Sequence, residues 1–216
     1  IFTIIANSKL IKMNIFIILI VHYTFLTNIH FYIPFILFLF KSYCCMNNIV
    51  KNFALLGSSG YIARKHVTVI NNLKKKLLLA YDPHNNSGYL DSFFPKCDFA
   101  KNEKNFFSLI KKKRITYVVI CSPNYLHFSH IKKSLINGAN VICEKPTVLS
   151  FKQLKIIKNL EKKYKRKCYS IFQLRYNTNI INLNSKIKKL KKISNIELKY
   201  VTYRGKWYDT SWKSNP

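Results

Sequence analysis

The chain has 216 residues, of which 49% are hydrophobic and 15% aromatic, and its formal net charge is +29. This composition supplies ample apolar surface for a core and excludes a globally disordered chain. The length allows one large domain, or one domain and part of another. The lysines accompany heavy asparagine and isoleucine usage along the whole chain, so we attribute the charge to solvated helix faces rather than to nucleic-acid binding.

The six cysteines follow no disulfide framework and no C-x-x-C spacing. Cys44 and Cys45 are adjacent, whereas Cys121 and Cys143 each close an apolar run. We therefore expect buried thiols in a reducing compartment, with no metal site. The expected location is the cytoplasm.

Residues 1–45 contain no acidic residue, and Ile15–Phe40 is almost wholly apolar. A helix of this length would cross a bilayer, but polar residues and Pro34 interrupt the stretch. Because Met46 stands shortly before the first regular strand, we interpret residues 1–45 as translated upstream sequence. A membrane anchor is the alternative, and we expect contact with a membrane only if that alternative holds.

From Asn52 onward, short apolar runs alternate with amphipathic segments. The predicted strands are Phe53–Leu56, Leu77–Tyr81, Thr116–Cys121, Val141–Cys143 and Cys168–Leu174, and the predicted helices are Tyr61–Leu73, Lys101–Lys113, Leu126–Ile136 and Phe151–Tyr164. Strands that are continuous apolar runs between helices favour a parallel sheet covered on both faces. Right-handed crossovers then give an α/β fold with a doubly wound, Rossmann-type sheet.

The sequence Gly-Ser-Ser-Gly at 57–60 follows the first strand at once and opens a helix. Glycines there permit positive φ and let the backbone approach a pyrophosphate, which a helix N-terminus favours. The turn is shorter than G-x-G-x-x-G and has Ala63 in place of the third glycine. Asp82 ends the second strand, where a carboxylate accepts both ribose hydroxyls of NAD and repels the 2′-phosphate of NADP. A turn-initiating aspartate before Pro83 is the alternative for this residue.

Polar residues also follow the predicted strand Thr116–Cys121. They are Ser122-Pro123-Asn124 and, a little later, His127. Because the carboxyl ends of parallel strands meet at one edge of the sheet, these groups would flank the nicotinamide and its ribose. Exposure to solvent on a helix is an equal alternative for His127.

Val141–Cys143 delivers Glu144, Lys145 and Pro146 onto a loop, because proline gives no N–H to a strand ladder. A solvated strand end would explain these three residues by themselves. A partly desolvated lysine beside a nicotinamide can exchange a proton with a substrate hydroxyl while hydride leaves for NAD. We expect Glu144 to hold Lys145 in place.

The motifs Gly-Ser-Ser-Gly-Tyr-Ile-Ala, Cys-Ser-Pro-Asn-Tyr-Leu-His and Cys-Glu-Lys-Pro occur in this order. Together they resemble the Gfo/Idh/MocA oxidoreductases. Gln173-Leu174-Arg175 and residues 204–213 are similar to one branch of that family, the UDP-2-acetamido-2-deoxy-glucuronate 3-dehydrogenases of surface-polysaccharide synthesis. The resemblance runs from about Phe53 to Trp212.

The resemblance implies NAD-dependent oxidation of the C3 hydroxyl of UDP-N-acetylglucosaminuronate by a homo-oligomer. Its partners would be NAD and a UDP-sugar, without nucleic acid. Lys145 matches the catalytic lysine of the family. The dinucleotide-binding positions are matched by Gly57, Gly60, Tyr61, Ile62, Asp82, Ser122, Asn124, His127 and Glu144. The positions that handle substrate are matched by Arg175, Arg204, Trp207, Tyr208 and Trp212, for which packing on an amphipathic strand is an equal alternative.

The family's second domain is an α+β domain with an open antiparallel sheet, which supplies an Asp/His pair to the catalytic lysine. By this resemblance we expect residues 46–172 to form the NAD-binding domain and residues 173–216 the truncated start of the second, with Asn195–Tyr208 as its first strand. Asn177 departs from the histidine of that branch. The chain would then be an N-terminal fragment, inactive alone.

Two competing functions remain open at this stage. One is a nucleic-acid or anionic-surface binder that uses the runs Lys74–Lys76, Lys111–Arg114, Lys162–Lys167 and Lys186–Lys192. The other is a non-catalytic relative that keeps NAD for its structure.

Overall fold

The computed structural model describes residues 51–84, 88–189, 199, 201 and 205–209. The described residues up to Gln173 belong to one compact unit, and those from Leu174 onward belong to another. The described part of the first unit contains a parallel sheet of six strands in the order β3-β2-β1-β4-β5-β6. The strands are β1 (Asn52–Leu56), β2 (Lys76–Tyr81), β3 (Asp98–Phe99), β4 (Tyr117–Ile120), β5 (Asn140–Cys143) and β6 (Cys168–Ser170).

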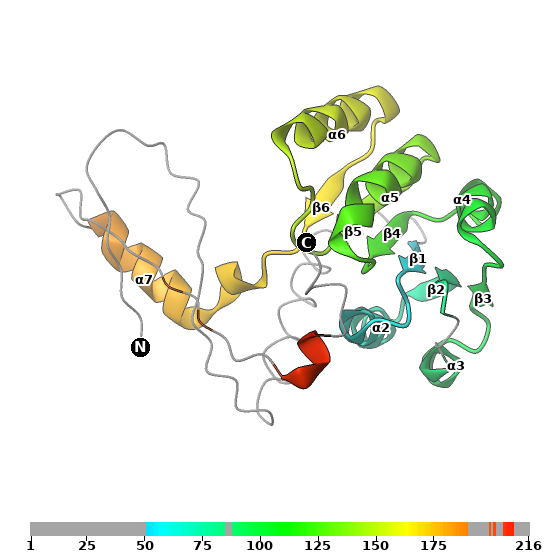
Figure 1. The fold of residues 1–216 in the computed structure, drawn as a ribbon, viewed down its shortest axis with the longest axis horizontal. Helices are drawn as coiled ribbons and strands as arrows, with labels where there is room; N and C mark the ends of the chain where they lie inside the picture. The colour runs from blue at the N-terminus through cyan, green and yellow to red at the C-terminus, as the bar shows by residue number, and fades with distance from the viewer. Residues whose placement is uncertain (1–50, 85–87, 190–198, 200, 202–204, 210–216) are drawn as a thin grey trace. The chain divides into compact units, whose positions relative to one another are not determined.

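Helices cover both faces of this sheet (Figure 1). The helices of the first unit are α2 (Tyr61–Asn72), α3 (Tyr89–Phe93), α4 (Glu103–Lys112), α5 (Asn124–Ile136) and α6 (Phe151–Tyr164). The apolar side chains of α2 and α3 pack with one face of the strands, and those of α4, α5 and α6 pack with the other. Figure 1 shows this division, with α2 and α3 on the opposite side of the strands from α4–α6.

The central strands β1 and β4 are short and apolar where they cross the core. Val118, Val119 and Ile120 in β4 are all 0% exposed, although alternate side chains point to opposite faces. Such burial on both faces is what a parallel sheet requires, and each large side chain so buried contributes roughly 1.5–3 kcal/mol. The predicted Rossmann-type sheet is confirmed.

Most predicted elements lie within two residues of the observed ones, and helix Phe151–Tyr164 has the predicted bounds. The strand predicted as Cys168–Leu174 is wrong beyond Ser170. Its last pair in the sheet is Cys143↔Ser170, and Ile171 N donates to the Cys143 carbonyl at 2.9 Å. Since β5 ends there, the chain finds no further strand to pair with. It continues as the 3₁₀ turn η1 (Gln173–Tyr176).

The second unit contains α7 (Thr178–Lys189) and a 3₁₀ turn, η2 (Lys206–Tyr208). The prediction of a strand over Asn195–Tyr208 is wrong at its described end, because Tyr208 N donates to the Gly205 carbonyl at 2.9 Å and closes a turn. Most of the remaining residues of that prediction lie outside the described part of the chain. The sequence also did not predict α3, α7 or the two-residue strand β3.

Candidate functional site

The turn after β1 is built around Gly57, which has a φ of +78°. A Cβ atom at this position would lie 2.6 Å from the backbone nitrogen of Ser122 and 2.7 Å from the carbonyl carbon of Cys121. Gly60 N closes the turn by donating to the Gly57 carbonyl at 3.2 Å. Only glycine fits position 57, because the turn passes so close to the end of β4.

Helix α2 begins directly behind this turn. Its cap residue, Gly60, contributes no side-chain hydrogen bond, and its first turn contains no acidic residue. By contrast, Asn102 caps α4 and Ser150 caps α6 through their side chains. The N-terminus of α2 therefore suits an anionic ligand, which the backbone N–H groups and the helix dipole would stabilise.

Asp82 follows β2 and is bound to the neighbouring turn. Its Oδ2 accepts from Ser59 N at 3.1 Å, and its Oδ1 accepts from His84 N at 3.0 Å. The residue is 8% exposed. Each carboxylate oxygen still has capacity for a further hydrogen bond, so Asp82 can accept from a ribose while it fixes the turn.

Tyr89, at the start of α3, supports the turn from another side, a role that we did not predict from the sequence. Its hydroxyl donates to the Ser58 carbonyl at 2.6 Å, and the Arg64 guanidinium carbon lies 4.9 Å from the centre of its ring. Burial raises the pKa of Tyr89 far above its usual range, so the phenol keeps its proton and remains a donor.

The loop after β4 is held by two buried histidines of α5. Ser122 Oγ pairs with His130 Nδ1 at 2.8 Å, and the Ser122 carbonyl is 2.8 Å from His127 Nε2. His127 Nδ1 lies 2.6 Å from the Pro146 carbonyl, in the loop after β5. His127 is only 1% exposed, so it is not the solvent-exposed helix residue that we considered. Its imidazole joins the two loops.

The loop after β5 combines a buried carboxylate with an exposed lysine. Glu144 Oε1 lies 2.9 Å from His66 Nε2, which comes from α2, and both side chains are largely removed from solvent. We expected Glu144 to hold Lys145, but His66 is the partner that the structure gives it. The side chain of Lys145 is exposed, and the Lys145–Pro146 peptide bond is cis.

The remaining predicted cofactor residues lie at helix N-termini. Tyr61 and Ile62 are in the first turn of α2, and Asn124 is the first residue of α5. Of the predicted substrate residues, Arg175 lies in η1, and Trp207 and Tyr208 lie in η2, all within the second unit. Arg204 and Trp212 lie outside the described residues, as do residues 1–45.

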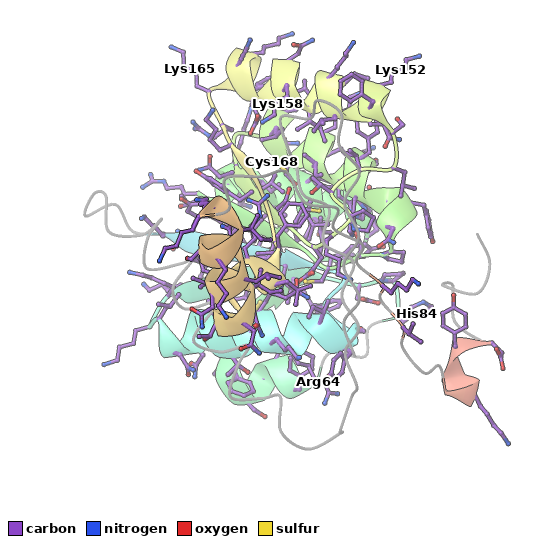
Figure 2. The ribbon with its side chains drawn as sticks, turned by 90° about the vertical axis from the view of Figure 1, so that its left-hand side faces the viewer. Arg64, His84, Lys152, Lys158, Lys165 and Cys168 are labelled. Atoms are coloured by element: carbon purple, nitrogen blue, oxygen red, sulfur yellow. The ribbon has the colours of Figure 1, made fainter. Side chains whose placement is uncertain are left out.

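The lysine runs are divided among several helices. Exposed lysines follow α2 and occur in α4, α5 and α6, which cover opposite faces of the sheet. Figure 2 shows Lys152 and Lys158 on α6 and Lys165 just after it, while Arg64 lies on α2 at the opposite side of the unit. This distribution favours solvated helix faces over one continuous basic surface.

Among the described residues, none of the helices is long and apolar enough to span a membrane. No group of three or more His, Cys, Asp or Glu side chains in that part of the chain is arranged to hold a metal ion.

Comparison with known proteins identifies the family. Residues 51–172 match the Gfo/Idh/MocA oxidoreductase family with the NAD-binding Rossmann fold. The chain belongs to this family. The expected family membership is therefore confirmed, and the turn at 57–60 with Asp82 lies inside the matched NAD-binding domain.

The chain is similar to the WlbA (WbpB) dehydrogenase from Thermus thermophilus, with 34% sequence identity. Superposition on the crystal structure of that enzyme with NAD and α-ketoglutarate gives a TM-score of 0.71 over 76% of this chain and 55% of that one. Its structure with NAD and UDP-GlcNAcA gives a TM-score of 0.70 with the same identity and coverage. Glucose-6-phosphate 3-dehydrogenase from Bacillus subtilis is 27% identical over 128 residues, which cover 59% of this chain and 35% of that protein.

The residues present fit the cofactor of the family. Gly57 keeps the turn free of a Cβ atom, the N-terminus of α2 is open to an anion, and Asp82 lies at the end of the adjacent strand. These three features come from two neighbouring strands and the helix between them. NAD is therefore the cofactor of this domain. The chain spans about half the length of the Thermus dehydrogenase.

Proposed function

We propose that the protein is an NAD-dependent dehydrogenase that oxidises the C3 hydroxyl of UDP-GlcNAcA. The observation that carries the proposal is the meeting of three groups at the carboxyl edge of one parallel sheet. Gly57 follows β1, Asp82 follows β2 and Lys145 follows β5. The order of strands reverses between β1 and β4, and doubly wound sheets bind their ligands at such a point.

The cofactor would be held by groups of this chain. The backbone at 57–60 and the first turn of α2, with Tyr61 and Ile62, would take the pyrophosphate, and Asp82 would accept from the adenine ribose hydroxyls. Ser122, Asn124 and Glu144 would lie along the nicotinamide half, whereas His127 would act through the loops that it joins. These residues lie at or shortly after the carboxyl ends of β1, β2, β4 and β5.

Lys145 would act as the general base. NAD, when bound, accepts the hydride that leaves C3 of the sugar. As the C–H bond breaks, the proton of the C3 hydroxyl would pass to the neutral amine of Lys145, and the C–O single bond would become a carbonyl. The exposure of Lys145 leaves it accessible to a hydroxyl that arrives at the sheet edge. His66 would keep Glu144, and with it the backbone of the loop, in place.

The substrate side is proposed from resemblance. The Thermus dehydrogenase, 34% identical to this chain, has a structure with NAD and UDP-GlcNAcA. We propose that residues 46–172 form the cofactor domain and that residues 173–216 begin the substrate domain. Within the latter, Arg175 and Arg204 would pair with the carboxylate or pyrophosphate of the sugar nucleotide, and Trp207, Tyr208 and Trp212 would stack on sugar or base.

Calorimetry with NAD and an absorbance assay for NADH test this function together. We expect this chain to bind NAD, and a form extended by the rest of the family's second domain to produce NADH with UDP-GlcNAcA. UDP-N-acetylglucosamine, which has no uronate carboxylate, is the matched control substrate, and it should give much less NADH. A protein that binds no NAD would contradict the function itself. Equal rates with the two sugar nucleotides would contradict the proposed substrate.

A further inference from the structure

The two residues that flank Lys145 are each held by a histidine, and the two histidines come from opposite faces of the sheet. His66 of α2 reaches Glu144 at 2.9 Å, and His127 of α5 reaches the Pro146 carbonyl at 2.6 Å. The two helices pack with different faces of the strands. The loop that carries Lys145 is therefore fixed from both sides.

His127 lies between two backbone carbonyl groups. Its second nitrogen, Nε2, is 2.8 Å from the Ser122 carbonyl, so both ring nitrogens face carbonyl oxygens. A carbonyl oxygen only accepts, whereas a neutral imidazole has one N–H and one lone pair. At 1% exposure the ring is removed from bulk solvent. Both contacts are hydrogen bonds only when both nitrogens carry protons.

The other buried histidine of α5, His130, carries no positive charge near neutral pH. His130 lies one turn further along α5, and burial lowers its pKa to about 4. It is therefore neutral near pH 7, and it pairs with the Ser122 hydroxyl rather than with the carbonyl. Glu103 lies 3.7 Å from His130 Nε2 and forms an ion pair with Lys133. Hydrogen bonds from an ionised donor are about twice as strong as neutral ones. A protonated His127 would therefore link the loops after β4 and β5 more firmly than a neutral one.

We propose that His66 and His127 form a two-histidine clamp that positions Lys145, and that His127 does so as an imidazolium. The importance of the clamp for catalysis rests on the proposed function, in which Lys145 is the base. The clamp itself does not. Both histidines are positioning residues, since their partners are Glu144 and the backbone of the loops rather than a substrate.

The first test is an NMR measurement of the protonation of the His127 ring nitrogens in the unaltered chain. The chain is labelled with ¹⁵N-histidine, and long-range proton–nitrogen NMR spectra are recorded at pH 7, with His127 assigned through its own backbone. We expect two protonated-type nitrogens for His127. The exposed His84 is the internal reference, because its side chain is open to solvent, whereas that of His127 is buried between two loops. One unprotonated nitrogen in His127 would overturn the imidazolium clamp.

Amide hydrogen exchange of the loop gives the second test. We expect His66→Gln and His127→Gln each to raise the exchange rate of the Lys145 amide on the order of fivefold, as for one lost hydrogen bond. His84→Gln is the matched control and should leave that rate unchanged. Loop exchange that is unaltered in both clamp variants would contradict the positioning role. If a variant does not fold, the ring nitrogens of the unaltered chain still decide the protonation state. A chain that binds no NAD would contradict the proposed function alone, because both readouts are independent of the cofactor.

Discussion

The amide of Ser59 donates to the carboxylate of Asp82 at 3.1 Å, although 23 residues separate the two in the chain. Ser59 lies in the turn after β1, and Asp82 ends the adjacent strand β2. The group expected to bind the ribose is thus attached to the turn expected to bind the pyrophosphate. A change at either position therefore affects both parts of the cofactor site, and variants must be chosen to separate charge from structure.

Asp82→Asn removes the charge of this residue but keeps its size and one acceptor oxygen. We expect the preference for NAD over NADP to fall about tenfold, because a carboxylate close to the 2′-phosphate repels it by roughly 1–4 kcal/mol near a protein surface. Calorimetry with both cofactors measures the ratio of affinities. Asp91→Asn, at an exposed position on α3, is the matched control and should leave the ratio as it is. An unchanged ratio in Asp82→Asn would remove Asp82 from the ribose site.

Gly57→Ala tests the close approach of the turn to β4. The added methyl group would lie 2.6 Å from Ser122 N, at a φ of +78°. The left-handed backbone alone costs roughly 1–2 kcal/mol for a residue with a side chain, and the clash adds to that cost. We expect urea unfolding to show a loss of at least about 2 kcal/mol, together with weakened NAD binding.

Gly88→Ala is the control for this variant. No atom lies within 4 Å of the position that its Cβ would take, and its φ is −52°. We expect its unfolding free energy and its NAD affinity to stay close to those of the unaltered chain. Equal losses in the two variants would mean that the contact with Ser122 is not what makes glycine necessary at position 57.

The sheet and its ligand edge could be predicted because their signals are local. The core of β4 is a continuous apolar run, as strands buried on both faces must be, and Pro146, which cannot continue a strand ladder, lies in the loop after β5. Gly57 and Asp82 could be singled out because strand ends carry the polar groups of such a fold. Their spacing along the chain follows from one βαβ unit.

The contacts that fix the site could not be predicted, because they join residues far apart in the chain. His66 and Glu144 are 78 residues apart, and His127 reaches across to Pro146 from another helix. A histidine on a helix gives no sign of which strand end it will meet. The short strand β3 and the end of β6 were missed for a related reason. The length of each depends on how many residues of the neighbouring strand are available for backbone pairing. Tertiary pairing decides such elements, and local preference does not.

The buried His130 should make the stability of the fold sensitive to acid. Burial lowers its pKa from 6.5 to about 4 in the folded chain. Between these two values the unfolded chain binds a proton that the folded chain does not, so stability is present above pH 6.5 and is lost as the pH falls toward 4. The loss from this residue amounts to roughly 3 kcal/mol. Urea unfolding at several pH values should show a shallower slope for His130→Gln than for the unaltered chain, and His84→Gln should not change the slope.

Lys145→Ala tests the proposed base. In a form of the chain extended by the rest of the family's second domain, we expect turnover of UDP-GlcNAcA to fall by about a hundred- to ten-thousandfold, which is what a general acid–base group contributes. NAD affinity should stay nearly unchanged, because the phosphate-binding turn and Asp82 lie at β1 and β2, whereas Lys145 follows β5. Steady-state rates and calorimetry on the same preparation separate the two effects.

Lys152→Ala is the matched control for that variant, because it removes an exposed lysine of α6 without changing the loop after β5. Its turnover and its affinity for NAD should both equal those of the unaltered protein. Lys145→Arg extends the test, since the guanidinium keeps the positive charge but does not give up a proton near neutral pH. We expect it to be as inactive as Lys145→Ala. An active Lys145→Arg variant would mean that position 145 supplies only charge, and the base would then have to be sought elsewhere at the sheet edge.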